Sequence, residues 1–210
     1  MRIIKKLVPY FVANAVALSF LFSNDLCAWS GGPPAYRTGA PNDLGTCNDI
    51  GCHNSFELNS GSAVFSITGP DTYIPGKFMR IEISFTESSG VLHGFEMTAL
   101  DANNNRVGKF KKISKTTRVI SPNDESRGLR KEDKGKYVEH TAAGNKKKKW
   151  RVKWKAPANA TDPITFYAAG NEANGDGNPA GDFIYTTTKK INAASSAVKT
   201  ADFAPNLIHE

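Results

Sequence analysis

The sequence has few stretches that could form a long helix, because its 210 residues include 18 glycines and 11 prolines. Both residue types destabilise helix interiors, which disfavours a helix bundle or a coiled coil. No glycine-rich phosphate-binding loop follows a predicted strand, so the usual signature of a nucleotide-binding α/β domain is missing. Apolar residues make up 40% and charged residues 22% of the chain, as in ordinary globular proteins. We therefore expect a folded chain with little helix.

Long apolar runs are also missing, except near the N-terminus. Three basic residues among the first six precede an apolar run over residues 7–22, and residues 26–28 offer acceptable cleavage subsites. This layout is typical of a secretory signal peptide, and the run is short for a bilayer span. We predict that residues 1–28 are removed, rather than kept as an anchor, and that no other segment spans a membrane. The mature protein is then expected to be periplasmic or extracellular.

Cleavage changes the charge and the cysteine count. It removes three basic residues, Asp25 and Cys27, so the formal net charge falls from +7 to +5 and only Cys47 and Cys52 remain. The four lysines at 146–149 stand at a turn, where like charges are usually solvated. We predict no nucleic-acid partner. If these lysines do act, they would attract an acidic redox partner protein, an anionic surface or a polysaccharide.

The body of the chain reads as a series of short strands separated by turn signals. In the clearest case, three apolar residues of segment 150–155 alternate with three basic ones, the period of a half-buried strand. The predicted strands are 62–67, 78–85, 94–100, 107–110, 150–155, 164–169 and 183–191. Such a series indicates an all-β sandwich or barrel.

Two segments are expected to be irregular. Residues 29–60 are rich in glycine, proline and asparagine, and should wrap over the strands. Residues 111–136 are polar and charged, and read as a long exposed connection. We predict one domain over residues 29–192, followed by a loose C-terminal tail over 193–210.

The segment that carries chemistry runs from Cys47 through Cys52 to His53. A cysteine directly followed by histidine, with another cysteine upstream, is the attachment pattern of c-type haem. Two thiols add to the porphyrin vinyl groups and the adjoining imidazole reaches the iron. The usual spacing has two residues between the cysteines, and here there are four. On spacing alone, a disulfide between Cys47 and Cys52 is the simpler hypothesis. A zinc or copper site has too few clustered ligands to compete.

Several motifs in order resemble the bacterial branch of the Reeler domain, also called the choice-of-anchor V domain. They extend over most of the mature chain, from about Gly32 to Ile191. The segments that carry the resemblance are 33–41, 45–47, 67–70, 73–76, 94–100, 137–141, 154–157 and 164–171. The resemblance implies an exported immunoglobulin-like β-sandwich. It also implies a cysteine pair ending in Cys-His, with the two recurrent histidines of the family at His53 and His140.

If haem is bound, the second iron ligand must come from elsewhere in the chain. The resemblance favours His140, with Met97 and His93 as alternatives. Met97 keeps the apolar period of its strand and is expected in the core. His93 precedes that strand and is expected to be a solvated turn residue.

Two functional hypotheses follow. The first is an exported monohaem c-type module for electron transfer or redox sensing, in which Cys47 and Cys52 attach haem c, His53 is proximal and His140 distal. The second is a structural or adhesive module with a Cys47–Cys52 disulfide and basic loops for a polyanion. No enzymatic activity is predicted, because two histidine ligands leave no open position on the iron.

Overall fold

The computed structural model describes residues 30–195. The predicted signal peptide and most of the predicted tail lie outside the described residues. Within them, three single-turn 3₁₀ helices interrupt the connections, namely η1 (Glu125–Arg127), η2 (Lys131–Asp133) and η3 (Ala142–Gly144). The strands are β1 (Val64–Thr68), β2 (Thr72–Tyr73), β3 (Phe78–Thr86), β4 (Leu92–Leu100), β5 (Lys109–Lys112), β6 (Thr117–Val119), β7 (Val138–His140), β8 (Lys149–Lys155), β9 (Ile164–Ala173) and β10 (Phe183–Ala193).

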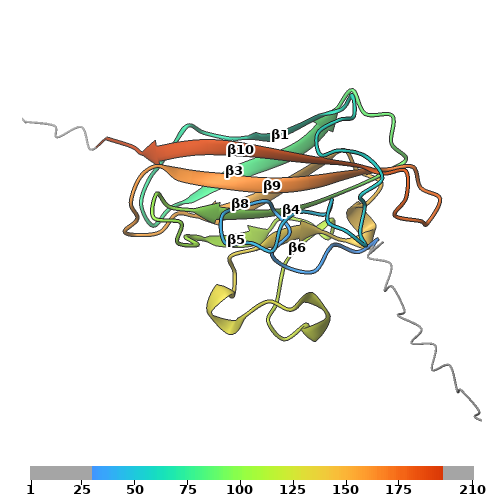
Figure 1. Cartoon of the computed structure of the whole chain (residues 1–210). Helices are drawn as coiled ribbons and strands as arrows, with labels where there is room; N and C mark the ends of the chain where they lie inside the picture. Colours follow the sequence, from blue (N-terminus) through green and yellow to red (C-terminus); the bar gives the residue numbers. More distant parts are fainter. Residues whose placement is uncertain (1–29, 196–210) are drawn as a thin grey trace, which may run out of the picture.

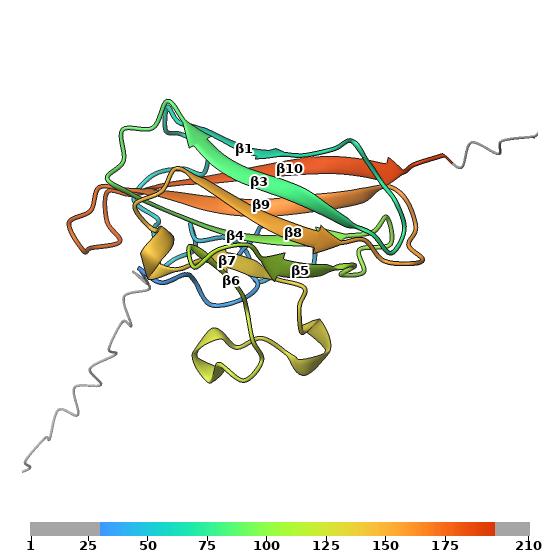
Figure 2. The same cartoon turned by 180° about the vertical axis from the view of Figure 1, so that it is seen from behind.

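The strands form two sheets that stack as a sandwich, which confirms the predicted all-β class. One sheet has the order β1-β3-β8-β5 and the other the order β2-β10-β9-β4-β7-β6. Figure 1 faces the six-stranded sheet and Figure 2 the four-stranded one. All of the pairings are antiparallel except that of β2 with β10.

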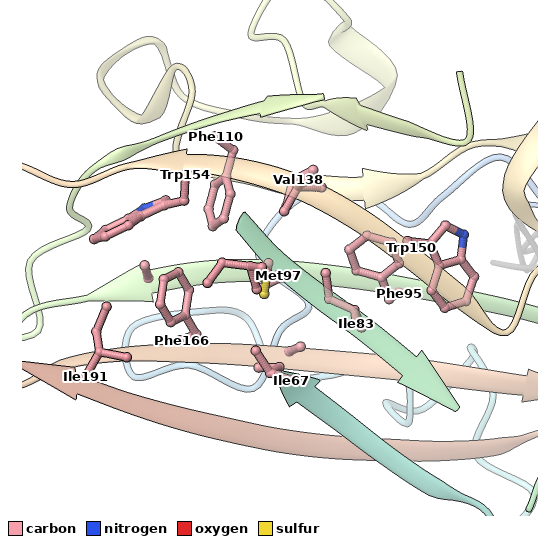
Figure 3. Packing of buried hydrophobic residues seen from close by; sticks show 14 of the residues in the cluster. Ile67, Ile83, Phe95, Met97, Phe110, Val138, Trp150, Trp154, Phe166 and Ile191 are labelled. Atoms are coloured by element: carbon pink, nitrogen blue, oxygen red, sulfur yellow. The ribbon is translucent and has the colours of Figure 1, made fainter. Parts of the chain in front are cut away.

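One apolar core fills the space between the sheets. Strand β8 shows why: Trp150, Val152 and Trp154 are at most 1% exposed, while the basic residues between them face outward. This alternation follows from the two-residue period of a strand, and it confirms the prediction for this segment. Figure 3 shows Phe95 and Trp150 together between the sheets, and their ring centroids lie 5.0 Å apart.

The seven predicted strands are all present, but three short ones were not predicted. Strands β2, β6 and β7 have two or three residues each. Strand β7 pairs with β4 on one side and β6 on the other. Strands of this length have too few residues to show an alternation of apolar and polar side chains. Strand β6 also pairs with β7 across a long loop, which protrudes from the sandwich in Figure 1.

The prediction for residues 111–136 is therefore wrong in part. Besides β6, this segment buries Ile120 and Leu129, which form a second apolar cluster with Ala35, Tyr36 and Tyr137. The physical reason is a partner that lies far away in the sequence: although most of the connection is exposed, Ile120 and Leu129 pack on the N-terminal segment.

The N-terminal segment itself is irregular, as predicted, and crosses the six-stranded sheet (blue in Figure 1). Glu96 of β4 is fully buried beneath it and accepts hydrogen bonds from the backbone N–H groups of Tyr36 (3.1 Å) and Arg37 (2.9 Å). A buried carboxyl group needs such donors. The segment is thus fixed to the sheet by a polar side chain as well as by apolar contacts.

None of the helices in the described part of the chain is long and apolar enough to cross a membrane.

Candidate functional site

One cavity gathers most of the predicted site residues. It is formed by the N-terminal segment, by β4 and β9, and by the loop after β9, and it encloses about 940 Å³ including space open to solvent. Its lining includes Cys47, Cys52, His53, His93, His140 and Asn171. Segments that are distant in the sequence therefore present thiols and imidazoles to one shared space.

The two cysteines lie on a tight loop in the wall of this cavity. The backbone N–H of His53 donates to the carbonyl oxygen of Cys47 (3.0 Å), and that of Cys52 donates to the carbonyl oxygen of Asp49 (2.9 Å). Burial, followed by the nearby charge of Glu96, raises the pKa of the Cys47 thiol. This sulfur therefore stays protonated at neutral pH.

Cys47 and Cys52 are separate thiols in the structure, so the alternative prediction of a disulfide between them is wrong here. The loop is closed by its backbone hydrogen bonds instead of by a covalent link. Both residues are part of the cavity wall.

His53 is 8% exposed, and a buried carboxylate fixes its ring. The Nδ1 atom lies 2.8 Å from Oδ2 of Asp182, whose other oxygen accepts the backbone N–H of Asn174. An ionised carboxylate can only accept, so Nδ1 carries the proton and Nε2 keeps its lone pair. Nε2 is then the acceptor nitrogen of the ring, and Nδ2 of Asn171 lies 3.4 Å from it. A bond from Nδ1 to a carboxylate is common among metal-ligating histidines.

His140 ends β7, and its ring occupies the place where Gly94 has no side chain. A Cβ atom at Gly94 would lie 2.5 Å from Cε1 of His140, so a larger residue would displace the ring. The Nδ1 atom lies 3.1 Å from the backbone nitrogen of Phe95 and 3.3 Å from its carbonyl oxygen, which satisfies either neutral tautomer. Burial lowers the pKa of His140 to about 4. The ring is therefore neutral at pH 7, the form that binds metals.

His93 is buried at 3% exposure within β4, so its prediction as a solvated turn residue is wrong. Its Nε2 atom lies 2.6 Å from the hydroxyl of Ser88, which in turn donates to Glu172 (2.6 Å). Because the serine proton goes to Glu172, Nε2 of His93 must donate and Nδ1 must be an acceptor. That Nδ1 atom is buried and has no hydrogen-bond partner within residues 30–195.

Met97 lies in the core, as predicted, and is fully buried. It is not part of the cavity lining. No group of three or more His, Cys, Asp or Glu side chains in the described range could hold a metal ion by itself. A metal held inside a porphyrin needs only one or two protein ligands, and the cavity lining offers that number.

Sequence reasoning missed the polar partners of the histidines. Asp182 follows a loop rich in glycine and asparagine, and Asn171 and Glu172 lie on β9. No local motif connects them to His53 or His93. The only available signal was that three polar residues lie in or beside otherwise apolar strands.

The comparisons with known proteins agree with this structure. No curated protein matches the chain. The Reeler domain family model matches residues 45–173, which is more than half of the sequence and includes the cysteine loop and β1 to β9. The match confirms the resemblance to Reeler domains, while the bacterial branch stays a prediction. The chain belongs to the Reeler domain family.

Proposed function

We propose that this Reeler domain is an exported c-type haem protein that transfers electrons or senses redox state. Reeler domains are typically extracellular modules without catalytic activity. One observation carries the proposal: two thiols and the imidazoles of His53 and His140, which are far apart in the sequence, line the same cavity.

One feature of the cavity lining fits such a group. Two buried polar atoms of lining residues, Nδ1 of His93 and Oδ1 of Asn171, lack a hydrogen-bond partner among the described residues. Buried polar atoms are seldom left unsatisfied, so these two point to a ligand or water in the cavity.

In this proposal, Cys47 and Cys52 would hold haem c through thioether bonds, and His53 and His140 would be the proximal and distal ligands of its iron. The bound haem supplies the one-electron chemistry. Asp182 keeps the proton on Nδ1 of His53 and thereby directs Nε2 to the metal. The backbone carbonyl oxygen of Phe95 lies 3.3 Å from Nδ1 of His140 and can accept a hydrogen bond from it in the same way.

The protein surroundings also favour electron transfer over catalysis. The cavity wall buries both histidines, at 8% exposure for His53 and 6% for His140. Two imidazole ligands leave no coordination position for a substrate, and they give a lower potential than a histidine and methionine pair. The partner would be a redox protein that reaches the open side of the cavity.

The test is to export the chain in cells that contain a cytochrome c maturation system. We expect a coloured protein whose intact mass includes one porphyrin that denaturation does not release. The variants Cys47→Ser and Cys52→Ser should each leave one thioether bond, which shifts the pyridine haemochrome maximum. A colourless product lighter by two hydrogens, with no covalent porphyrin, would overturn the proposal.

A further inference from the structure

The outer face of the four-stranded sheet carries rows of basic residues that face one another across neighbouring strands. Arg80 of β3 lies opposite Lys153 of β8, which lies opposite Lys111 of β5. In the next row, Lys155 of β8 lies opposite Lys109 of β5. We call these five residues the cationic band; the face that holds them is turned to the viewer in Figure 2.

The band has no internal counter-charge. No acidic side chain within residues 30–195 forms an ion pair with any of its five members. The row beside it is different, because there Glu82 lies opposite Arg151 and pairs with it (2.8 Å). Glu82 also pairs with Lys149 of the row beyond (2.9 Å). Positive charge is therefore concentrated in two adjacent rows.

Protection of a sheet edge does not account for this pattern. Lysines on an edge strand prevent pairing with other chains, and this explains those of β5. Strand β8, however, lies between β3 and β5, so Lys153 and Lys155 do not guard an edge. Like charges directly opposite each other destabilise a sheet, which makes rows of cations costly unless they meet an anion.

The crowding of charge also affects a neighbouring residue. Burial, and then the charge of Lys109, lowers the pKa of Lys136.

At the other end of the band, Arg80 and Arg151 flank a shallow hollow on the same face, together with Thr68, Gly69 and Glu82. Guanidinium groups bind carboxylate and sulfate oxygens in a bidentate manner. Arg151 is paired with Glu82, so Arg80 is the residue that can offer its guanidinium group to an anion in this hollow.

We propose that the cationic band binds a linear polyanion that carries carboxylate or sulfate groups, that is, an acidic polysaccharide. The charged area is a strip across three strands, bordered by the row in which Glu82 lies opposite Arg151, and then by a row in which Ser84 lies opposite Lys149. A chain of anionic sugars fits a strip of this form. A bilayer presents charge evenly and would bring Glu82 against anionic headgroups as well.

This binding site is separate from the haem cavity. None of the five residues of the band lines the cavity, which is built on β4 and β9 of the other sheet. A polysaccharide on the band would hold the protein at a surface and leave the cavity open to a redox partner. The inference therefore does not depend on whether haem is bound.

The test uses the full exported chain and three probes: alginate for carboxylates, chondroitin sulfate for sulfates, and neutral dextran. The variant Arg80→Ser/Lys111→Ser/Lys153→Ser removes one row. Because an exposed ion pair contributes up to about 1 kcal/mol, we expect its affinity for alginate or chondroitin sulfate to fall about tenfold or more. Dextran should not bind.

The matched control, Lys146→Ser/Lys147→Ser/Lys190→Ser, removes the same charge from exposed positions elsewhere. It should lose less than about threefold in affinity. A second band variant, Lys109→Ser/Lys155→Ser, provides the same test if the first does not fold. Equal losses in band and control variants, binding of neither acidic polysaccharide, or binding only to phosphatidylglycerol vesicles would each overturn the proposal.

Discussion

Nδ1 of His53 donates a hydrogen bond to Oδ2 of Asp182 across 2.8 Å, and this bond determines which nitrogen of the imidazole is available to a metal. The two residues come from opposite ends of the described chain. Asp182 is 2% exposed, so water cannot replace it easily. In the haem protein proposed above, Asp182 is a positioning residue for the proximal ligand.

The first prediction concerns this bond. Asp182→Asn removes the negative charge that makes His53 a stronger electron donor, so the reduction potential of the haem-loaded protein should rise. An outer-shell partner typically changes metal affinity by a factor of about 10–100, which corresponds to a shift of about 60 mV or more. The measurement is a potentiometric titration.

Asp176→Asn is the matched control, because Asp176 is exposed in the loop between β9 and β10. Its potential should stay at the wild-type value. If the two variants shift equally, Asp182 has no special role as a partner of His53.

A second prediction separates the candidate distal ligands. His140→Ala should convert the absorption spectrum of the haem-loaded protein from a six-coordinate, low-spin form to a high-spin form, since the sixth ligand is lost. His93→Ala should leave the low-spin spectrum in place. The opposite result would assign the ligand to His93, whose Nδ1 has no partner within residues 30–195.

The third prediction tests the space beside Gly94. Gly94→Ala would place a methyl group 2.5 Å from the ring of His140, and overpacking of this kind costs about 1–3 kcal/mol. We expect the free energy of unfolding to fall by that amount in urea titrations of the haem-free protein. Gly31→Ala should have little effect, because a Cβ atom there meets nothing closer than 3.9 Å. Equal stabilities of the two variants would contradict the close contact.

A fourth prediction follows from Glu96. Burial, and then the charge of Glu139, raises its pKa well above the usual value, so the folded state keeps a proton that the unfolded state releases. The folded state then binds more protons above about pH 4.5, and its stability should fall as pH rises from there. The Glu96→Gln variant has no ionisable group at this position. Between pH 5 and 8, its free energy of unfolding should therefore decline less than that of the wild type, by about 1 kcal/mol or more.

The measurement is a set of urea titrations across that pH range. Glu57→Gln is the control, because Glu57 is exposed. A Glu96→Gln protein that declines as steeply as the wild type would show that Glu96 is ionised in the fold.

A fifth prediction concerns the cost of the cationic band. Lys153→Thr relieves repulsion from Arg80 and Lys111 and should stabilise the domain by about 0.2–1 kcal/mol. Arg151→Thr, two positions away on the same strand, breaks the pair with Glu82 instead and should not stabilise it. Thermal unfolding of both variants tests this, and a destabilised Lys153→Thr protein would argue against repulsion in the row.

The sequence predicted the features that depend on local patterns. The alternation of Trp150, Val152 and Trp154 identified a strand and its buried face correctly. The spacing of Cys47, Cys52 and His53 identified the loop that lines the cavity. Each of these patterns is complete within about ten residues, so no knowledge of the rest of the fold was needed.

Features that depend on register between distant strands could not be predicted. His93 is buried because β4 pairs with β9, which places Glu172 directly opposite it. Asp182 reaches His53 only after the N-terminal segment has crossed the sheet. His140 was singled out through the family resemblance, since a three-residue strand has no period of its own.

The N-terminal segment, which crosses the six-stranded sheet, must be part of any fragment of this domain that is to fold. The family match begins at residue 45 and ends at 173, yet Tyr36 and Arg37 supply the donors to Glu96, and β10 pairs with β9 along nine residues. A fragment cut at the limits of the match would expose a buried carboxylate and leave one side of β9 unpaired. Expression of this domain should therefore include residues 30–193, well beyond the region by which its family is recognised.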